Sequence, residues 1–97
     1  MASVTLWFGT WVSTGPGDDF EPGETHAWSA WGYSYGDAIS VTAHPVPDLA
    51  AWARRALVVE NLHTETLRTG HRLIFTVRNV GSTPIPRYGL GVGWIGR

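Results

Sequence analysis

Apolar and polar residues alternate along several short stretches of this chain, a pattern typical of half-buried β-strands. The clearest stretch is 72–80, where Leu73, Phe75 and Val77 point one way and the residues between them point the other. The expected strands are 3–12, 24–35, 38–43, 56–64, 72–80 and 87–95. Turn-forming residues separate them, and this spacing predicts an antiparallel β-sandwich of six or seven strands.

The connections follow from glycine and proline. Residues 13–23 form a loop rich in both, and Gly36-Asp37 is expected to close a hairpin over 24–43. Pro45 and Pro47 end that hairpin because proline cannot donate to a strand ladder. Asp48 can cap one short helical turn through Ala53, which we interpret as a crossover between two sheets.

Two strands have faces of unusual composition. In the last strand Gly89, Gly91 and Gly93 form one face, and the other carries large apolar residues: Tyr88, Leu90, Val92 and Trp94. In the first strand the even positions make an ordinary core face, comprising Val4, Leu6, Phe8 and Val12. The opposite face is mixed and holds Ser3, Thr5, Trp7, Gly9 and Trp11.

Composition narrows the class of protein. The 97 residues correspond to one domain, 1–97, and the absence of cysteine excludes disulfides and thiolate metal sites. The net charge of −1 argues against nucleic-acid binding, because proteins of that class carry a basic surface. No apolar run reaches the ~20 residues of a membrane span, no signal peptide is visible, and the compartment stays open. The chain stops almost flush with its last strand, which favours a stand-alone unit.

Six tryptophans are the most informative feature. Trp7 and Trp11 share one face of the first strand, about 13–14 Å apart at ~3.4 Å per residue. If the first and last strands are neighbours, these rings can cover the glycine face, and we prefer this packing explanation. Self-association and ligand binding are the other two interpretations.

The second strand carries aromatic residues on both faces. We assign Trp28 to the core, which leaves Trp31, Tyr33 and Tyr35 as an outer patch suited to recognition. The opposite assignment, with these three residues in the core, stays open.

Ionisable residues give weaker signals. Asp18, Asp19, Glu21 and Glu24 can ligate Ca²⁺, but a solvated acidic turn is the better explanation. His63 and His71 flank a hairpin turn and can approach each other, although we expect all four histidines, His26, His44, His63 and His71, to be surface polar residues. No nucleophile elbow, phosphate loop or zinc spacing is present, so we expect no enzyme, no cofactor and no metal.

Two turn signatures carry a resemblance to a known family. The strand Phe75–Val77 runs into Asn79-Val80-Gly81, and Pro22-Gly23-Glu24 precedes Trp28. These elements resemble those of bacterial cell-adhesion-related immunoglobulin-like (CARDB-type) domains, in which the Asn-x-Gly element comes first. Here the order is reversed, so the chain resembles a permuted relative or a separate immunoglobulin-like family.

A further likeness is to small bacterial β proteins with a Gly-x-x-His-x-Trp strand, here residues 23–28. Both resemblances imply an immunoglobulin-like sandwich that serves adhesion or binding. We expect a non-catalytic module that binds itself or another protein through Trp7, Trp11, Trp31, Tyr33 and Tyr35. The alternative is a small carbohydrate-binding domain, in which the same aromatic residues stack on sugars and Asp18, Asp19 or Glu24 bond hydroxyl groups.

Overall fold

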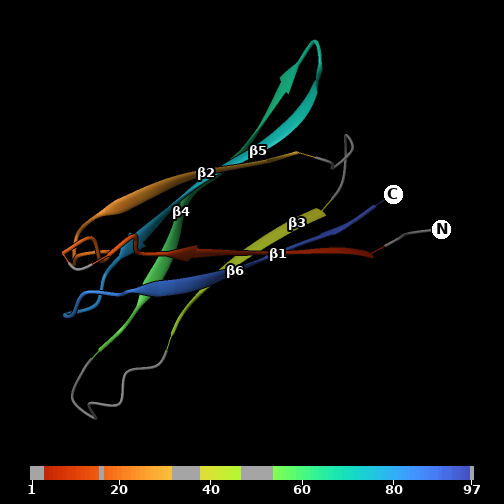
Figure 1. Cartoon of the computed structure of the whole chain (residues 1–97). Helices are drawn as coiled ribbons and strands as arrows, with labels where there is room; N and C mark the ends of the chain where they lie inside the picture. Colours follow the sequence, from red (N-terminus) through yellow and green to blue (C-terminus); the bar gives the residue numbers. More distant parts are fainter. Residues whose placement is uncertain (1–3, 16, 32–37, 47–53, 97) are drawn as a thin grey trace.

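A computed structural model of the chain describes residues 4–15, 17–31, 38–46 and 54–96. It contains six antiparallel strands in two three-stranded sheets (Figure 1). The first sheet has the order β1-β6-β3, with bounds Val4–Val12, Arg87–Ile95 and Ala38–Pro45. The second has the order β2-β5-β4, with bounds Thr25–Trp31, Gly70–Asn79 and Leu57–Leu67.

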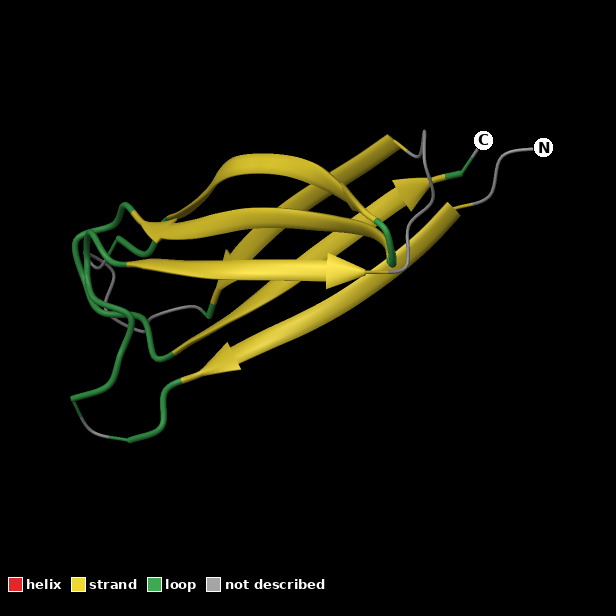
Figure 2. Ribbon diagram, turned by 90° about the horizontal axis from the view of Figure 1, so that it is seen from above, coloured by secondary structure: helices red, strands yellow, loops and turns green. Residues whose placement is uncertain are grey.

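The described ranges consist of strands and loops, with no helix among them (Figure 2). Accordingly, those ranges offer no apolar helix of membrane-spanning length. The expected helical turn at 48–53 and the turn at Gly36-Asp37 lie outside the described residues.

The two sheets face each other across one apolar core. The central strands supply most of it, because a strand flanked on both sides has its inner face fully covered. The alternation predicted for 72–80 and 87–95 is confirmed: the inward side chains are at most 2% exposed. Those residues are Leu73, Phe75 and Val77 from β5, and Tyr88, Leu90 and Val92 from β6.

The predicted hairpin over 24–43 is wrong. β2 pairs with β5 and β3 pairs with β6, so these consecutive strands belong to different sheets. Alternation tells which face of a strand is buried, but it carries no information about the partner strand. The hairpin that does form joins β4 to β5 through the predicted turn near Thr69-Gly70.

The face assignment of β1 is also reversed. β1 is indeed the neighbour of β6, with Trp11 opposite Tyr88 and Phe8 opposite Gly91. Directly paired residues point to the same side of a sheet, so Trp11 turns into the core and Phe8 turns out, 76% exposed. Both faces of this strand carry large apolar side chains, and only the pairing with β6 decides between them.

At one end of the sheets, the Pro22-Gly23 turn prepares the entry to β2. Glu24 N–H donates to the Glu21 carbonyl over 3.0 Å, and Gly23 has a φ of 87°, which glycine adopts without strain. The Glu24 carboxylate accepts the Glu21 N–H at 2.8 Å, closing the turn from the other side.

Asn79 joins this turn to the loop before β6. Its amide nitrogen donates to the carbonyls of Phe20 (2.8 Å) and Thr83 (3.1 Å). Its side-chain oxygen accepts the Gly81 N–H at 2.9 Å, and its backbone carbonyl accepts the Gly23 N–H at 2.8 Å. Asn79 is only 1% exposed, so these bonds form away from water.

Gly81 completes the arrangement for a steric reason. A Cβ at this position would lie 2.3 Å from the Arg54 carbonyl oxygen, so only glycine allows this close approach. The residues on either side, Val80 and Ser82, donate their N–H groups to Ala56 and Arg54.

Replacing Asn79 with alanine should lower the free energy of unfolding by about 2–4 kcal/mol, because buried hydrogen-bonding groups lose their partners. Urea unfolding measures this loss. The matched control is Ser82→Ala, an exposed position in the same loop, with an expected change within about 0.5 kcal/mol. Equal stability of the two variants would contradict the role assigned to Asn79.

Candidate functional site

An aromatic cluster fills one end of the interior. Trp11 lies 5.5 Å from Tyr88 and 4.7 Å from His26, measured between ring centroids, and Phe20 stacks on His26 at 3.9 Å. Trp28 is parallel to Phe75 at 6.5 Å, so its predicted core position is confirmed. Trp11 is therefore partly buried against the core, and His26, expected at the surface, is half-buried in this cluster.

The hydroxyl of Tyr88 is the polar centre of this cluster. It accepts a hydrogen bond from Trp28 Nε1 at 2.9 Å and lies 2.7 Å from His26 Nδ1. Since the hydroxyl has one proton, it can donate to Nδ1 only when the imidazole is neutral with its proton on Nε2. Burial lowers the pKa of His26 and raises the pKa of Tyr88, and both shifts favour this neutral pair.

An open surface of different character lies on the outer face of β1-β6-β3. A hollow of about 300 Å³ there has Gly89 and Gly91 as its floor. Its two walls come from the flanking strands: Phe8 and Thr10 on β1, and Thr42 and His44 on β3. We call these six residues the glycine trough.

The trough continues toward the start of β6. A second hollow, of about 250 Å³, shares Thr10, His44 and Gly89 with the first and reaches Arg87. One wall is polar, because His44 Nε2 and the Thr42 hydroxyl are hydrogen-bonded at 3.0 Å.

The monomer does not require glycine at position 89 of the floor. A Cβ on Gly89 would meet its nearest atom, the Gly9 carbonyl oxygen, at 3.8 Å, an ordinary contact. A Cβ on Gly91 would come within 3.1 Å of the Thr42 hydroxyl, a tight contact that would displace Thr42 from its hydrogen bond with His44. Neither glycine has a positive φ, and glycine inside a strand costs about 0.5–1 kcal/mol relative to alanine. Close packing against Thr42 thus accounts for glycine at 91, whereas the open floor at Gly89 is unexplained by folding alone.

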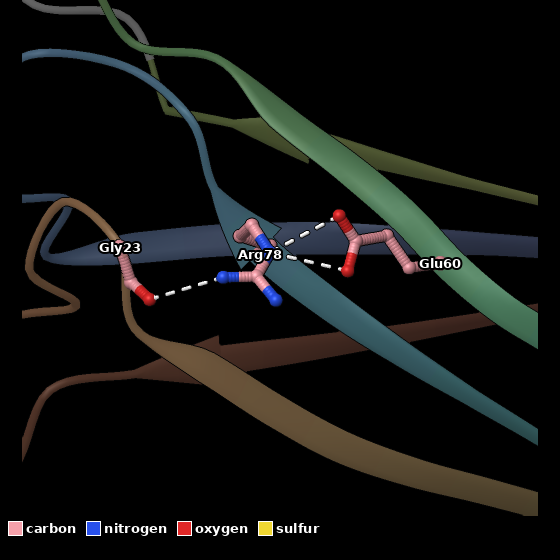
Figure 3. Close-up of polar contacts among 3 residues, drawn as sticks. All are labelled: Gly23, Glu60 and Arg78. Carbon is pink, nitrogen blue, oxygen red and sulfur yellow. Dashed lines mark hydrogen bonds and ion pairs between the residues drawn. The ribbon is translucent and has the colours of Figure 1, made fainter.

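The outer face of the other sheet is charged. Arg78 Nε donates to both carboxylate oxygens of Glu60, at 3.0 and 3.1 Å, and its Nη1 points to the Gly23 carbonyl (Figure 3). Arg72 Nε donates to Glu65 at 2.8 Å. Ion pairs of this kind keep a sheet face solvated and discourage apolar contact.

Trp31 lies at the end of this charged face and is 51% exposed, as the predicted outer patch requires. Its backbone is opposite that of Arg72, and a Cβ on Gly70 would lie 3.9 Å from its ring. Tyr33 and Tyr35 lie outside the described residues, as does the side chain of Trp7.

The acidic residues make turns. Asp18 accepts hydrogen bonds from the hydroxyl and the N–H of Thr14, which lower its pKa, and Glu24 closes the Pro22-Gly23 turn. Asp19 is half-buried next to Phe20 in the chain. The described ranges contain no group of three or more His, Cys, Asp or Glu side chains placed to hold a metal ion.

His63 and His71 do not form a pair. His63 pairs with Ile74 and His71 pairs with Thr66, and these register positions fall on opposite faces of the sheet. His63 Nδ1 lies 2.6 Å from the Asn61 carbonyl, beside a bulge between Glu60 and His63 that sequence spacing could not reveal.

Sequence reasoning missed the trough. The alternating glycines of 89–93 were recognised, but Phe8 was placed in the core and Thr10, Thr42, His44 and Arg87 were given no role. The signal was available in part, since three alternate glycines must leave one face of a strand bare. The residues that form the two walls can be identified only from the register of β1 and β3 on β6.

Comparison with known proteins finds no matching family model, curated protein or solved structure.

His26 should make stability depend on pH. Its folded-state pKa lies below its usual value of 6.5, so the unfolded chain takes up a proton at a higher pH than the folded chain does. The contribution of neutral His26 to the free energy of unfolding should be complete above about pH 6.5. It should decrease as the pH falls below that value. Glu24 and Asp18 act in the opposite direction but less strongly than burial.

Urea unfolding at a series of pH values measures this dependence. His26→Gln should flatten the curve between about pH 7 and pH 5, whereas the exposed His63→Gln control should keep the slope of the unmodified protein. A slope that survives in His26→Gln would assign the effect to another group.

Proposed function

We propose that this chain is a non-catalytic binding module with an immunoglobulin-like sandwich fold, and that it binds a protein partner through the glycine trough. The observation that carries the binding proposal is the bare floor formed by Gly89 and Gly91, since the monomer has room for a larger side chain at position 89. An aromatic side chain, Phe8, stands exposed beside it. Aromatic anchors seated in pockets dominate the binding energy of protein interfaces.

The order of the strands supports the immunoglobulin-like assignment. Every described connection except that between β4 and β5 runs from one sheet to the other, as in interlocked Greek-key sandwiches. The two turn signatures also fall at strand ends, with Asn79-x-Gly81 after β5 and Pro22-Gly23 before β2.

The pairing of β1 with β6 supports the permuted alternative. Val4 pairs with Ile95, so the beginning of β1 lies beside the end of β6. Joining these ends and opening the chain between β3 and β4 would give the order β4-β5-β6-β1-β2-β3. In that order the Asn-x-Gly element precedes the Pro-Gly-Glu element, as in the resembled family. Adjacent ends are what allows such permutations in general.

The composition of the trough face supports a protein partner. Phe8, Val12 and Ile95 are 76%, 56% and 49% exposed on it, and its described residues include no carboxylate. Exposed apolar side chains gathered on one face that has few charges are typical of interaction sites.

Phenol provides a test that needs no known partner. As a mimic of an aromatic side chain, it should shift the backbone amide signals of Gly89 and Gly91 in ¹H–¹⁵N NMR spectra, with saturation. Gly89→Val should abolish the shifts, since its side chain fills the floor, while Trp31→Ser should keep them. Shifts confined to Trp31, or none at all, would overturn the assignment of the binding surface.

Carbohydrate binding is the second candidate, favoured by Trp31. Its half-exposed indole lies next to the paired charges of Arg72 and Glu65, which offers a flat ring beside hydrogen-bonding groups. A bound glycan should change the tryptophan fluorescence in a saturable way, and Trp31→Ala should remove the change. A flat response across a broad glycan array would exclude this candidate.

A further inference from the structure

We propose that the trough's partner is a second copy of this chain, with Phe8 of each protomer seated over Gly91 of the other. This inference rests on the proposed function, because it names the occupant of the same trough. The projecting ring and the hollow lie on one face of one molecule, which is the condition for a two-fold, self-complementary contact.

The strand register places the projecting Phe8 and the floor of the trough in one row across the sheet. Phe8 is opposite Gly91, and Gly91 is opposite Thr42 on the far side. The trough sheets of the two protomers face each other, and the two-fold axis lies between them, parallel to β6. This axis places β1 of one protomer over β3 of the other. Phe8 then lies above Gly91 and Thr42 of the second copy, and its counterpart occupies the equivalent position across the axis.

The bare floor gives this geometry a physical reason. Two sheets pack about 10 Å apart when side chains from both fill the space between them. A phenylalanine from one sheet fits such a layer only where the other sheet leaves room, and Gly89 and Gly91 leave it. A Cβ on Gly89 would meet only ordinary contacts within the monomer, so the room is available for an outside side chain.

Charge distinguishes this face from the opposite one. The outer face of β2-β5-β4 carries Glu60 with Arg78 and Glu65 with Arg72, which would have to be desolvated in a sheet-to-sheet contact. On the described part of the trough face, the ionisable side chains are His44 and Arg87, near one end. Association through the trough therefore leaves the ion pairs in water.

The size of the face predicts a weak dimer. Nine residues of β1 at ~3.4 Å each span about 30 Å, and three strands about 4.8 Å apart span about 14 Å. The face thus offers a contact area of roughly 400 Å² per protomer, which is below the ~800 Å² that each partner buries in a standard stable interface. The dimer should thus appear only as the concentration rises.

Sedimentation equilibrium from about 10 µM to about 1 mM protein tests the proposal. The unmodified chain should pass from monomer to dimer in this range. Phe8→Ser and Gly89→Val should each raise the dissociation constant by at least about tenfold. Trp31→Ser removes an exposed aromatic residue from the other sheet and should leave it unchanged. Circular dichroism confirms that each variant is folded; should Gly89→Val fail to fold, Phe8→Ser alone decides.

A mixture of the two variants tests the seating of Phe8. In a mixed dimer, the Phe8 ring of the Gly89→Val chain can still enter the open trough of the Phe8→Ser chain. One of the two contacts is therefore retained. The mixture should associate more tightly than either variant alone. No gain on mixing would overturn the contact, as would dissociation by Trp31→Ser.

A chain that stays monomeric at about 1 mM would overturn self-association while leaving the proposed function open. If phenol still shifts the Gly89 and Gly91 signals in that monomer, the trough binds a different protein. If phenol has no effect either, both proposals fail.

Discussion

The buried carboxamide of Asn79 joins two segments that are distant in sequence. It donates to the Phe20 carbonyl before β2 and to the Thr83 carbonyl after β5, and it accepts the Gly81 N–H. The backbone carbonyl of Asn79, at the end of β5, accepts the Gly23 N–H from the turn that begins β2. An amide at this position supplies both donors and an acceptor, and no apolar residue could satisfy the same backbone groups. Because these groups lie away from water, the segments cannot separate without leaving unpaired polar atoms.

The rest of the interior is built on this arrangement. Fixing the Phe20 carbonyl places Phe20 opposite Ile85, where the two residues exchange backbone hydrogen bonds of 2.9 Å. Ile85 then leads into β6, so that Tyr88 enters the core beside Phe20, Trp11 and His26. The Tyr88 hydroxyl in turn pairs with Trp28 and His26 from the opposite sheet. The two sheets are thereby linked by hydrogen bonds as well as by apolar contact.

The orientation of the β6 side chains also determines the outer surface of the first sheet. With Tyr88, Leu90 and Val92 directed inward, the pleat of β6 must present Gly89 and Gly91 outward. The flanking strands then add Phe8 on one side and Thr42 and His44 on the other. The bare trough is thus the outer side of a central strand that packs the core. The described outer positions of the second sheet carry paired arginine and glutamate instead.

The sequence by itself determined the class of fold and the position of most strands, because alternation over Leu73–Val77 and Tyr88–Val92 allows only one buried face. It also indicated the two turns at Pro22-Gly23 and Asn79-x-Gly81, in each of which a hydrogen bond joins residues close in sequence. It did not reveal the contacts of the second turn with Phe20 and Arg54. The strand partners needed the tertiary structure, since contacts distant in sequence leave no trace in a local pattern. Hence the expected hairpin over 24–43 was wrong, and β1 was turned the wrong way. Trp11 and Phe8 are both large and apolar, and only the register of β1 on β6 decided which of them packs the core and which stands beside the trough.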